Sequence, residues 1–97
     1  MTERATTIEK LEERKEQVVL LHGIARSARS MSKMATALER HRFAVLNLNY
    51  PSTSRSLAGL AQYVRERMCD AGSDGFEKLH FVTHSMGGVL VRVLLGE

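Results

Sequence analysis

Several features that define large classes of protein are missing from this 97-residue chain. There is no tryptophan, and the single cysteine, Cys69, excludes an internal disulfide framework. No segment approaches the ~20 consecutive apolar residues of a membrane-spanning helix, and the charged segment 1–17 has no apolar stretch of the kind found in secretory signals. The net charge of +3 is too small to indicate nucleic-acid binding by itself. We therefore expect a cytoplasmic protein with no transmembrane segment and no nucleic-acid partner.

Two kinds of apolar segment alternate along the chain. Uninterrupted apolar runs that contain β-branched residues are typical of strands buried on both faces of a parallel sheet. Between them, apolar residues recur at the three- and four-residue spacing of a helix. The alternation predicts an α/β fold with three layers, in which helices cover both faces of a small parallel sheet. The expected strands are 18–21, 43–48 and 79–82, and helical spacing covers 31–38, 57–68 and 89–94.

Polar residues and glycine mark the expected ends of these helices. Ser30 is the predicted N-cap of the first helix, which should end near His41. Ser54 or Ser56 can cap the second helix, and Gly72 is its predicted C-terminal stop.

The chain divides into a charged N-terminal segment, 1–16, and a single domain, 17–97. Alternating glutamate and basic residues in the first segment predict a short exposed helix or a tail. Within the domain, Met31 and Met34 are predicted to be core residues, although an acyl chain could also contact them. Cys69 is predicted to be a small buried or half-buried residue on a helix.

The segment around Ser85 has the clearest chemical pattern. A predicted strand leads into this serine, and Gly87 and Gly88 then open an apolar helix. A serine on such a turn lies at the positive end of a helix dipole, which suits a nucleophile. The side chain of Thr83 must fit beside the helix that follows Ser85, so a small residue is needed at this position. We expect threonine to be tolerated because it is small and its β-branched side chain suits the end of a strand. The simpler alternative is that Ser85 only caps the helix.

An earlier His-Gly pair, His22 and Gly23, follows the first predicted strand directly. The other histidines give no metal site, because His80 and His84 have no further ligands nearby in the sequence.

Three segments together resemble the lipase and esterase type of bacterial α/β hydrolase. They are Val-Val-Leu-Leu-His-Gly-Ile-Ala-Arg-Ser (18–27), Asn-Leu-Asn-Tyr-Pro-Ser (47–52) and Phe-Val-Thr-His-Ser-Met-Gly-Gly (81–88). The resemblance covers the N-terminal part of that fold, from the strand before the oxyanion loop to the helix after the nucleophile. It implies hydrolysis of an acyl ester or lipid, with no cofactor and no metal.

The resemblance also implies roles for individual residues. Ser85 would attack the carbonyl carbon and form an acyl-serine, while the backbone N–H groups of Ile24 and Met86 would form the oxyanion hole. The remaining residues of the two motifs would support the sharp turn at Ser85, called the nucleophile elbow, and the loop after the first strand, called the oxyanion loop. They are His22, Gly23, Thr83, His84, Gly87 and Gly88.

The chain departs from the family at the other two catalytic residues, the acid and the histidine. In such hydrolases the acid and the histidine follow the nucleophile, yet no Asp or His follows Ser85 here. We therefore expect little or no turnover from this chain alone, unless further residues complete the site. The alternative is a truncated, non-catalytic assembly module whose exposed sheet edges pair with a second copy or with a complementing C-terminal chain. Whether Glu97 is a natural end stays open.

Overall fold

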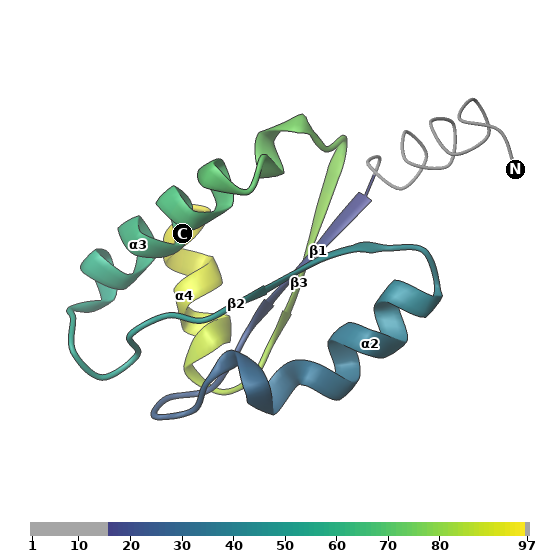
Figure 1. The fold of residues 1–97 in the computed structure, drawn as a ribbon. Helices are drawn as coiled ribbons and strands as arrows, with labels where there is room; N and C mark the ends of the chain where they lie inside the picture. Colours follow the sequence, from purple (N-terminus) through teal and green to yellow (C-terminus); the bar gives the residue numbers. More distant parts are fainter. Residues whose placement is uncertain (1–15, 97) are drawn as a thin grey trace, which may run out of the picture.

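The computed structural model describes residues 16–96. Strands and helices alternate in the predicted order, and each predicted strand and helix is present (Figure 1). The predicted helix or tail of segment 1–16 lies outside the described residues, except for Glu16, which begins the first strand. The elements are β1 (Glu16–Leu21), the 3₁₀ helix η1 (Ala28–Met31), α2 (Ser32–Arg40), β2 (Ala44–Leu48), α3 (Leu57–Asp70), the 3₁₀ helix η2 (Ser73–Gly75), β3 (Lys78–Thr83) and α4 (Met86–Leu94).

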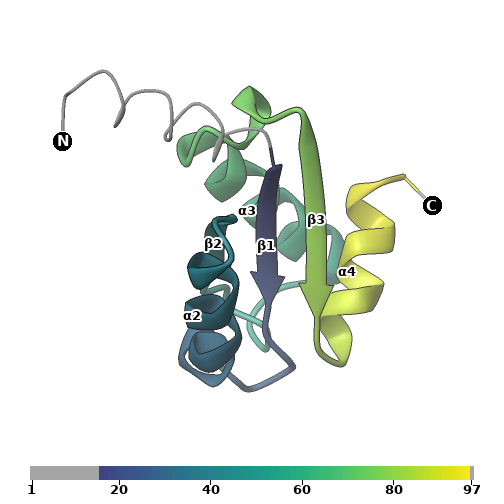
Figure 2. The same cartoon turned by 90° about the vertical axis from the view of Figure 1, so that its right-hand side faces the viewer.

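The three strands form one parallel sheet in the order β2-β1-β3 (Figure 2). In the register of the sheet, Val19 of β1 lies opposite Leu46 of β2 and Phe81 of β3. Because all strands run in the same direction, the loop after β1 and the turn after β3 meet at the same end of the sheet. This common end carries the residues that the sequence singled out.

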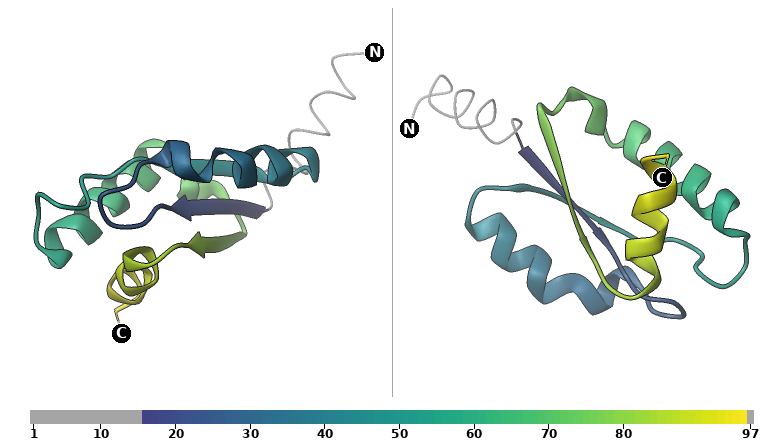
Figure 3. Two further views of the ribbon diagram at one scale, coloured as in Figure 1. Left: turned by 90° about the horizontal axis from the view of Figure 1, so that it is seen from below. Right: turned by 180° about the vertical axis from the view of Figure 1, so that it is seen from behind.

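Alternate residues of β1 face opposite layers, as strand geometry requires. Val18 and Leu20 pack toward α2, while Val19 and Leu21 pack toward α3 and α4. All four side chains are buried, which explains why this strand is an uninterrupted apolar run. The predicted three-layer arrangement is confirmed, with α2 on one face of the sheet and α3 and α4 on the other (Figure 3).

Both predicted signals at the ends of α3 are confirmed. The Ser56 hydroxyl oxygen accepts a hydrogen bond from the Gly59 N–H at 3.1 Å, and Gly72 follows the helix in the left-handed conformation with φ 77°. The predicted cap at Ser30 is wrong. Ser30 lies within η1 and donates its hydroxyl to the Ser27 carbonyl oxygen, because the chain is already helical before α2 begins.

Two burial predictions are also wrong. Met34 is 46% exposed, because it lies roughly 100° around α2 from Ala35, the residue of this helix that is buried against the sheet. Cys69 is exposed, since the buried stripe of α3 runs through Leu60 and its helical neighbours and ends at the half-buried Met68.

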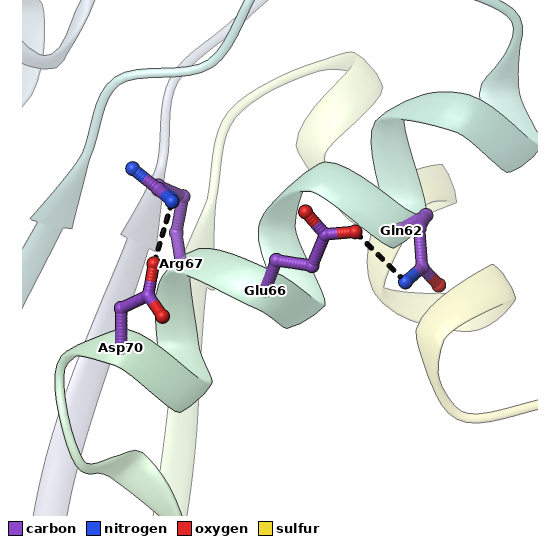
Figure 4. Close-up of polar contacts among 4 residues, drawn as sticks. All are labelled: Gln62, Glu66, Arg67 and Asp70. Atoms are coloured by element: carbon purple, nitrogen blue, oxygen red, sulfur yellow. Dashed lines mark hydrogen bonds and ion pairs between the residues drawn. The ribbon is translucent and has the colours of Figure 1, made fainter.

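The outer face of α3 carries polar side chains that pair with each other along the helix. Gln62 donates a hydrogen bond to Glu66, and Arg67 pairs with Asp70 (Figure 4). These groups are exposed, so each pair contributes only a few tenths of a kcal/mol to about 1 kcal/mol of stability. Within residues 16–96, no helix has the length and apolar character needed to cross a bilayer.

Candidate active site

Ser85 lies on a sharp turn between β3 and α4. Its backbone has φ 56° and ψ −120°, a conformation that a non-glycine residue adopts at a cost of about 1–3 kcal/mol. The preceding residue is tied to the sheet, because the His84 N–H donates to the Leu21 carbonyl oxygen at 3.1 Å. The turn is therefore strained and fixed to the sheet, and its serine is exposed beyond the end of the strand.

Gly87 allows α4 to lie directly against the sheet. A Cβ atom at this position would be 2.8 Å from the Leu21 carbonyl oxygen and 3.1 Å from the Thr83 Cβ, so no side chain fits there. A Cβ on Gly88 would meet only the Thr83 hydroxyl oxygen, at 3.4 Å. The two glycines thus make the room that Thr83 needs at its unusual position.

The loop after β1 lies beside this turn. A Cβ on Gly23 would be 2.7 Å from Nδ1 of His84 and 3.5 Å from the Cβ of Ser85. The structure therefore brings Gly23 and Ser85 together, and the imidazole of His84 packs directly over Gly23.

His22 is completely buried and both of its ring nitrogens are engaged. Nδ1 donates to the Gly23 carbonyl oxygen at 2.8 Å, and Nε2 accepts from the Tyr50 N–H at 3.2 Å. The ring also stacks on Tyr50, with centroids 4.2 Å apart. Because its one free lone pair is used by a backbone N–H, this imidazole cannot accept a proton from Ser85.

Three groups at the end of the sheet are free to meet a ligand. Within residues 16–96, the Ser85 hydroxyl forms no hydrogen bond, and the N–H groups of Ile24 and Met86 donate to no acceptor. Ile24 is 53% exposed. The nucleophile candidate and both candidate oxyanion donors are thus uncommitted.

Four polar residues within and after β2 also belong to this region. The sequence placed them in segment 47–52, which carries part of the family resemblance, but predicted no contact for them. Each bonds to the loop after β1. A polar residue that interrupts an apolar strand and the Tyr-Pro-Ser segment after it are visible in the sequence, but neither shows which residues these side chains bind. The residues are Asn47, Asn49, Tyr50 and Ser52.

A hollow of about 270 Å³ lies next to the elbow and is lined by Arg26, Ser30, Met31 and His84. Its lining combines the apolar side chain of Met31 with the hydroxyl of Ser30 and the cationic group of Arg26.

His80 lies away from the elbow. It pairs with Glu16 at 2.8 Å, near the start of β3, and the strand separates it from His84 by roughly 13 Å. In the part of the chain that the structure describes, no three His, Cys, Asp or Glu residues are grouped so that they could hold a metal ion.

A parallel α/β sheet that ends in a serine on a left-handed turn before a helix is the arrangement of the α/β serine hydrolases. The chain belongs to the family described as "Putative serine esterase (DUF676)", which matches residues 12–97. The family description indicates an esterase-type function. Comparisons with curated proteins and with solved structures gave no match.

Proposed function

We propose that this chain carries the nucleophile half of a carboxylic ester hydrolase of the lipase and esterase type. Ser85 Oγ attacks the carbonyl carbon, the bond to the alcohol oxygen breaks, and the serine proton leaves through a base to the departing alcohol. Water then cleaves the acyl-serine and returns the proton to Ser85. The observation that carries this proposal is the strained backbone of Ser85, at φ 56° and directly before α4.

The N–H groups of Ile24 and Met86 are the proposed oxyanion donors. Neither has another acceptor within residues 16–96, and the N-terminus of α4 adds a positive partial charge behind Met86. Donors that are already oriented toward the developing charge lower the barrier without reorganisation, and one such donor contributes about 3–4 kcal/mol.

We further propose that the general base and its acid come from outside residues 16–96. His22 is committed to Tyr50 and to the Gly23 carbonyl oxygen, and no Asp or His follows Ser85 in the printed sequence. Without a base, the hydroxyl is a weak nucleophile at neutral pH. The 97-residue chain by itself should therefore turn over esters very slowly.

Chemical rescue tests both parts of this proposal. The full chain is treated with a neutral fluorophosphonate, with and without added imidazole as an external base, and the labelled peptide is identified by mass spectrometry. We expect slow labelling of Ser85 in buffer, clear acceleration by imidazole, and no label in Ser85→Ala. No label at Ser85 even with imidazole would exclude the nucleophile role, whereas fast labelling without imidazole would show that the chain supplies its own base.

The exposed edge of β3 supports a second candidate, an assembly role. Among the described strands β3 pairs only with β1, and Leu79 on this strand is 37% exposed. Beside the edge is an apolar hollow of about 280 Å³, lined by Arg65, Met68, Leu79, Phe81, Leu94 and Leu95. Unpaired edges of this kind add strands from other chains, so we propose that a second copy or a complementing chain pairs here.

Sedimentation of the full chain over a range of concentrations tests self-association through this edge. We expect a concentration-dependent dimer, lost in Leu79→Lys because a charged edge resists pairing. Val89→Lys is the matched control, since Val89 is also exposed but does not line the hollow. A wild-type chain that stays monomeric throughout contradicts pairing between copies.

A further inference from the structure

Segment 47–52, which we name the clamp, holds the loop after β1 from one side. Its side chains reach backbone groups on both sides of Ile24. Asn49 Oδ1 accepts from the Ala28 N–H and Asn47 Nδ2 donates to the Ala28 carbonyl oxygen. These contacts fix the far end of the loop at the start of η1.

The clamp is tightest immediately around Ile24. On one side, the Tyr50 hydroxyl donates to the His22 carbonyl oxygen at 2.5 Å. On the other side, the Ala25 N–H donates to the Ser52 hydroxyl oxygen at 2.9 Å. Ile24 therefore lies between two residues whose backbone atoms are held by the clamp.

Ala25 needs such a restraint. Its φ is 58°, a left-handed conformation in which the alanine Cβ is crowded by the backbone. The bond from Ser52 comes from a side chain that is only 7% exposed, so water competes weakly for it. The Ile24 N–H lies in the peptide plane between Gly23 and Ile24, which stands between the two planes that Tyr50 and Ser52 hold. If the Ser52 bond is lost, Ala25 can return to a more relaxed backbone conformation, and the plane of the Ile24 N–H loses its restraint on the C-terminal side.

We propose that Ser52 is a positioning residue for the oxyanion hole. It holds Ala25 in its left-handed conformation and so keeps the Ile24 N–H directed toward the carbonyl oxygen bound at Ser85. This role depends on the proposed function, because it assumes that Ile24 supplies an oxyanion donor. Ser52 itself does not contact the reacting atoms.

A matched pair of substitutions separates positioning from general stability. Ser52→Ala and Ser56→Ala each remove a hydroxyl that accepts one backbone N–H, at 2.9 Å and 3.1 Å. Ser56 caps α3 and forms no hydrogen bond with the loop in the part of the chain that the structure describes. Ser52→Thr keeps the hydroxyl, so it should restore whatever the alanine variant loses.

Two measurements on the full chain test the role. Amide hydrogen exchange at Ala25 should speed up about tenfold in Ser52→Ala and stay unchanged in Ser56→Ala, since the bond is worth roughly 1–1.5 kcal/mol. Imidazole-assisted labelling of Ser85 should slow by about tenfold to a hundredfold in Ser52→Ala only. Ser52→Thr should recover both values.

The outcomes are distinct. Unchanged exchange at Ala25 in Ser52→Ala would show that the hydrogen bond does not hold the loop, and would overturn the proposal. Faster exchange with wild-type labelling would show that Ser52 is structural only. If the wild-type chain takes no label at Ser85, the proposed function and the positioning role both fail, and the exchange data still report whether the clamp forms.

Discussion

Gly87 lies so close to Leu21 that a methyl group on the glycine would be 2.8 Å from the leucine carbonyl oxygen. This contact fixes the distance between α4 and the central strand. Because the obstructing atom belongs to the backbone, it cannot move aside as a flexible side chain would. The position of Ser85 relative to the loop after β1 therefore depends on a residue that has no side chain.

Gly87→Ala should lower the free energy of unfolding by about 1–3 kcal/mol, because α4 must shift away from Leu21. Gly88→Ala is the control. Its added methyl would make only an ordinary contact with Thr83, and alanine favours a helix by about 0.5–1 kcal/mol over glycine. Urea unfolding of both variants measures the difference. Equal stability of the two alanine variants would be incompatible with the close approach.

Replacing Ser85 separates backbone strain from chemistry. Ser85→Gly should be about 1 kcal/mol more stable than Ser85→Ala, since glycine adopts φ 56° without strain but loses more entropy on folding. Neither variant keeps the hydroxyl, so any difference reports the backbone alone. Urea midpoints measure it, and a Ser85→Gly variant less stable than Ser85→Ala would show that the turn is unstrained.

Tyr50→Phe should cost about 1–3 kcal/mol, because the buried carbonyl oxygen of His22 loses its donor. The ring remains, so stacking on His22 is preserved. Tyr63→Phe is a suitable control, since the Tyr63 hydroxyl forms no hydrogen bond within residues 16–96; it should change stability by less than about 0.5 kcal/mol. Thermal and urea unfolding compare the two, and equal costs would contradict the assignment.

Burial also raises the pKa of the Tyr50 phenol above its ordinary value of 10.0. Below that pH the phenol is neutral in both the folded and unfolded chain and has no effect on the pH dependence. Above it, the unfolded chain ionises first and the folded chain retains its proton, so stability falls as the pH rises through the folded pKa. In the wild type, the free energy of unfolding should be lower at about pH 11 than at about pH 9, and Tyr50→Phe should reduce this difference. If the free energy of unfolding fell equally in the wild type and in Tyr50→Phe, the decline would come from groups other than Tyr50.

Most of the fold follows from local patterns in the sequence. The run 18–21 became the central strand because its residues must be buried on both faces. Ser56 caps the start of α3 and Gly72 follows its end, as their side-chain and backbone chemistry predicts. Ser30 failed as a cap because the chain had already entered η1. Periodicity cannot show this, since a single 3₁₀ turn of four residues is too short to change the spacing of the apolar residues.

The candidate site was predictable only in part. The motif indicated Ser85 and its glycines, yet it left Thr83 as an irregular position. The reason that threonine fits is the room above Gly87 and Gly88, which is a property of packing. The hydrogen bond between Ser52 and Ala25 could not be predicted from local sequence patterns, because it depends on how the loops after β1 and β2 meet once the two strands have paired.

That bond joins residues 27 positions apart. The loop after β1 is therefore held by a residue that lies beyond β2, and not only by its own neighbours in the sequence. Closing a segment of this length costs conformational entropy, and the parallel pairing of β1 with β2 helps to offset that cost, because it brings the two loops to the same end of the sheet. A substitution that weakens this strand pairing should therefore also loosen the loop that carries Ile24, although the two lie in different parts of the chain.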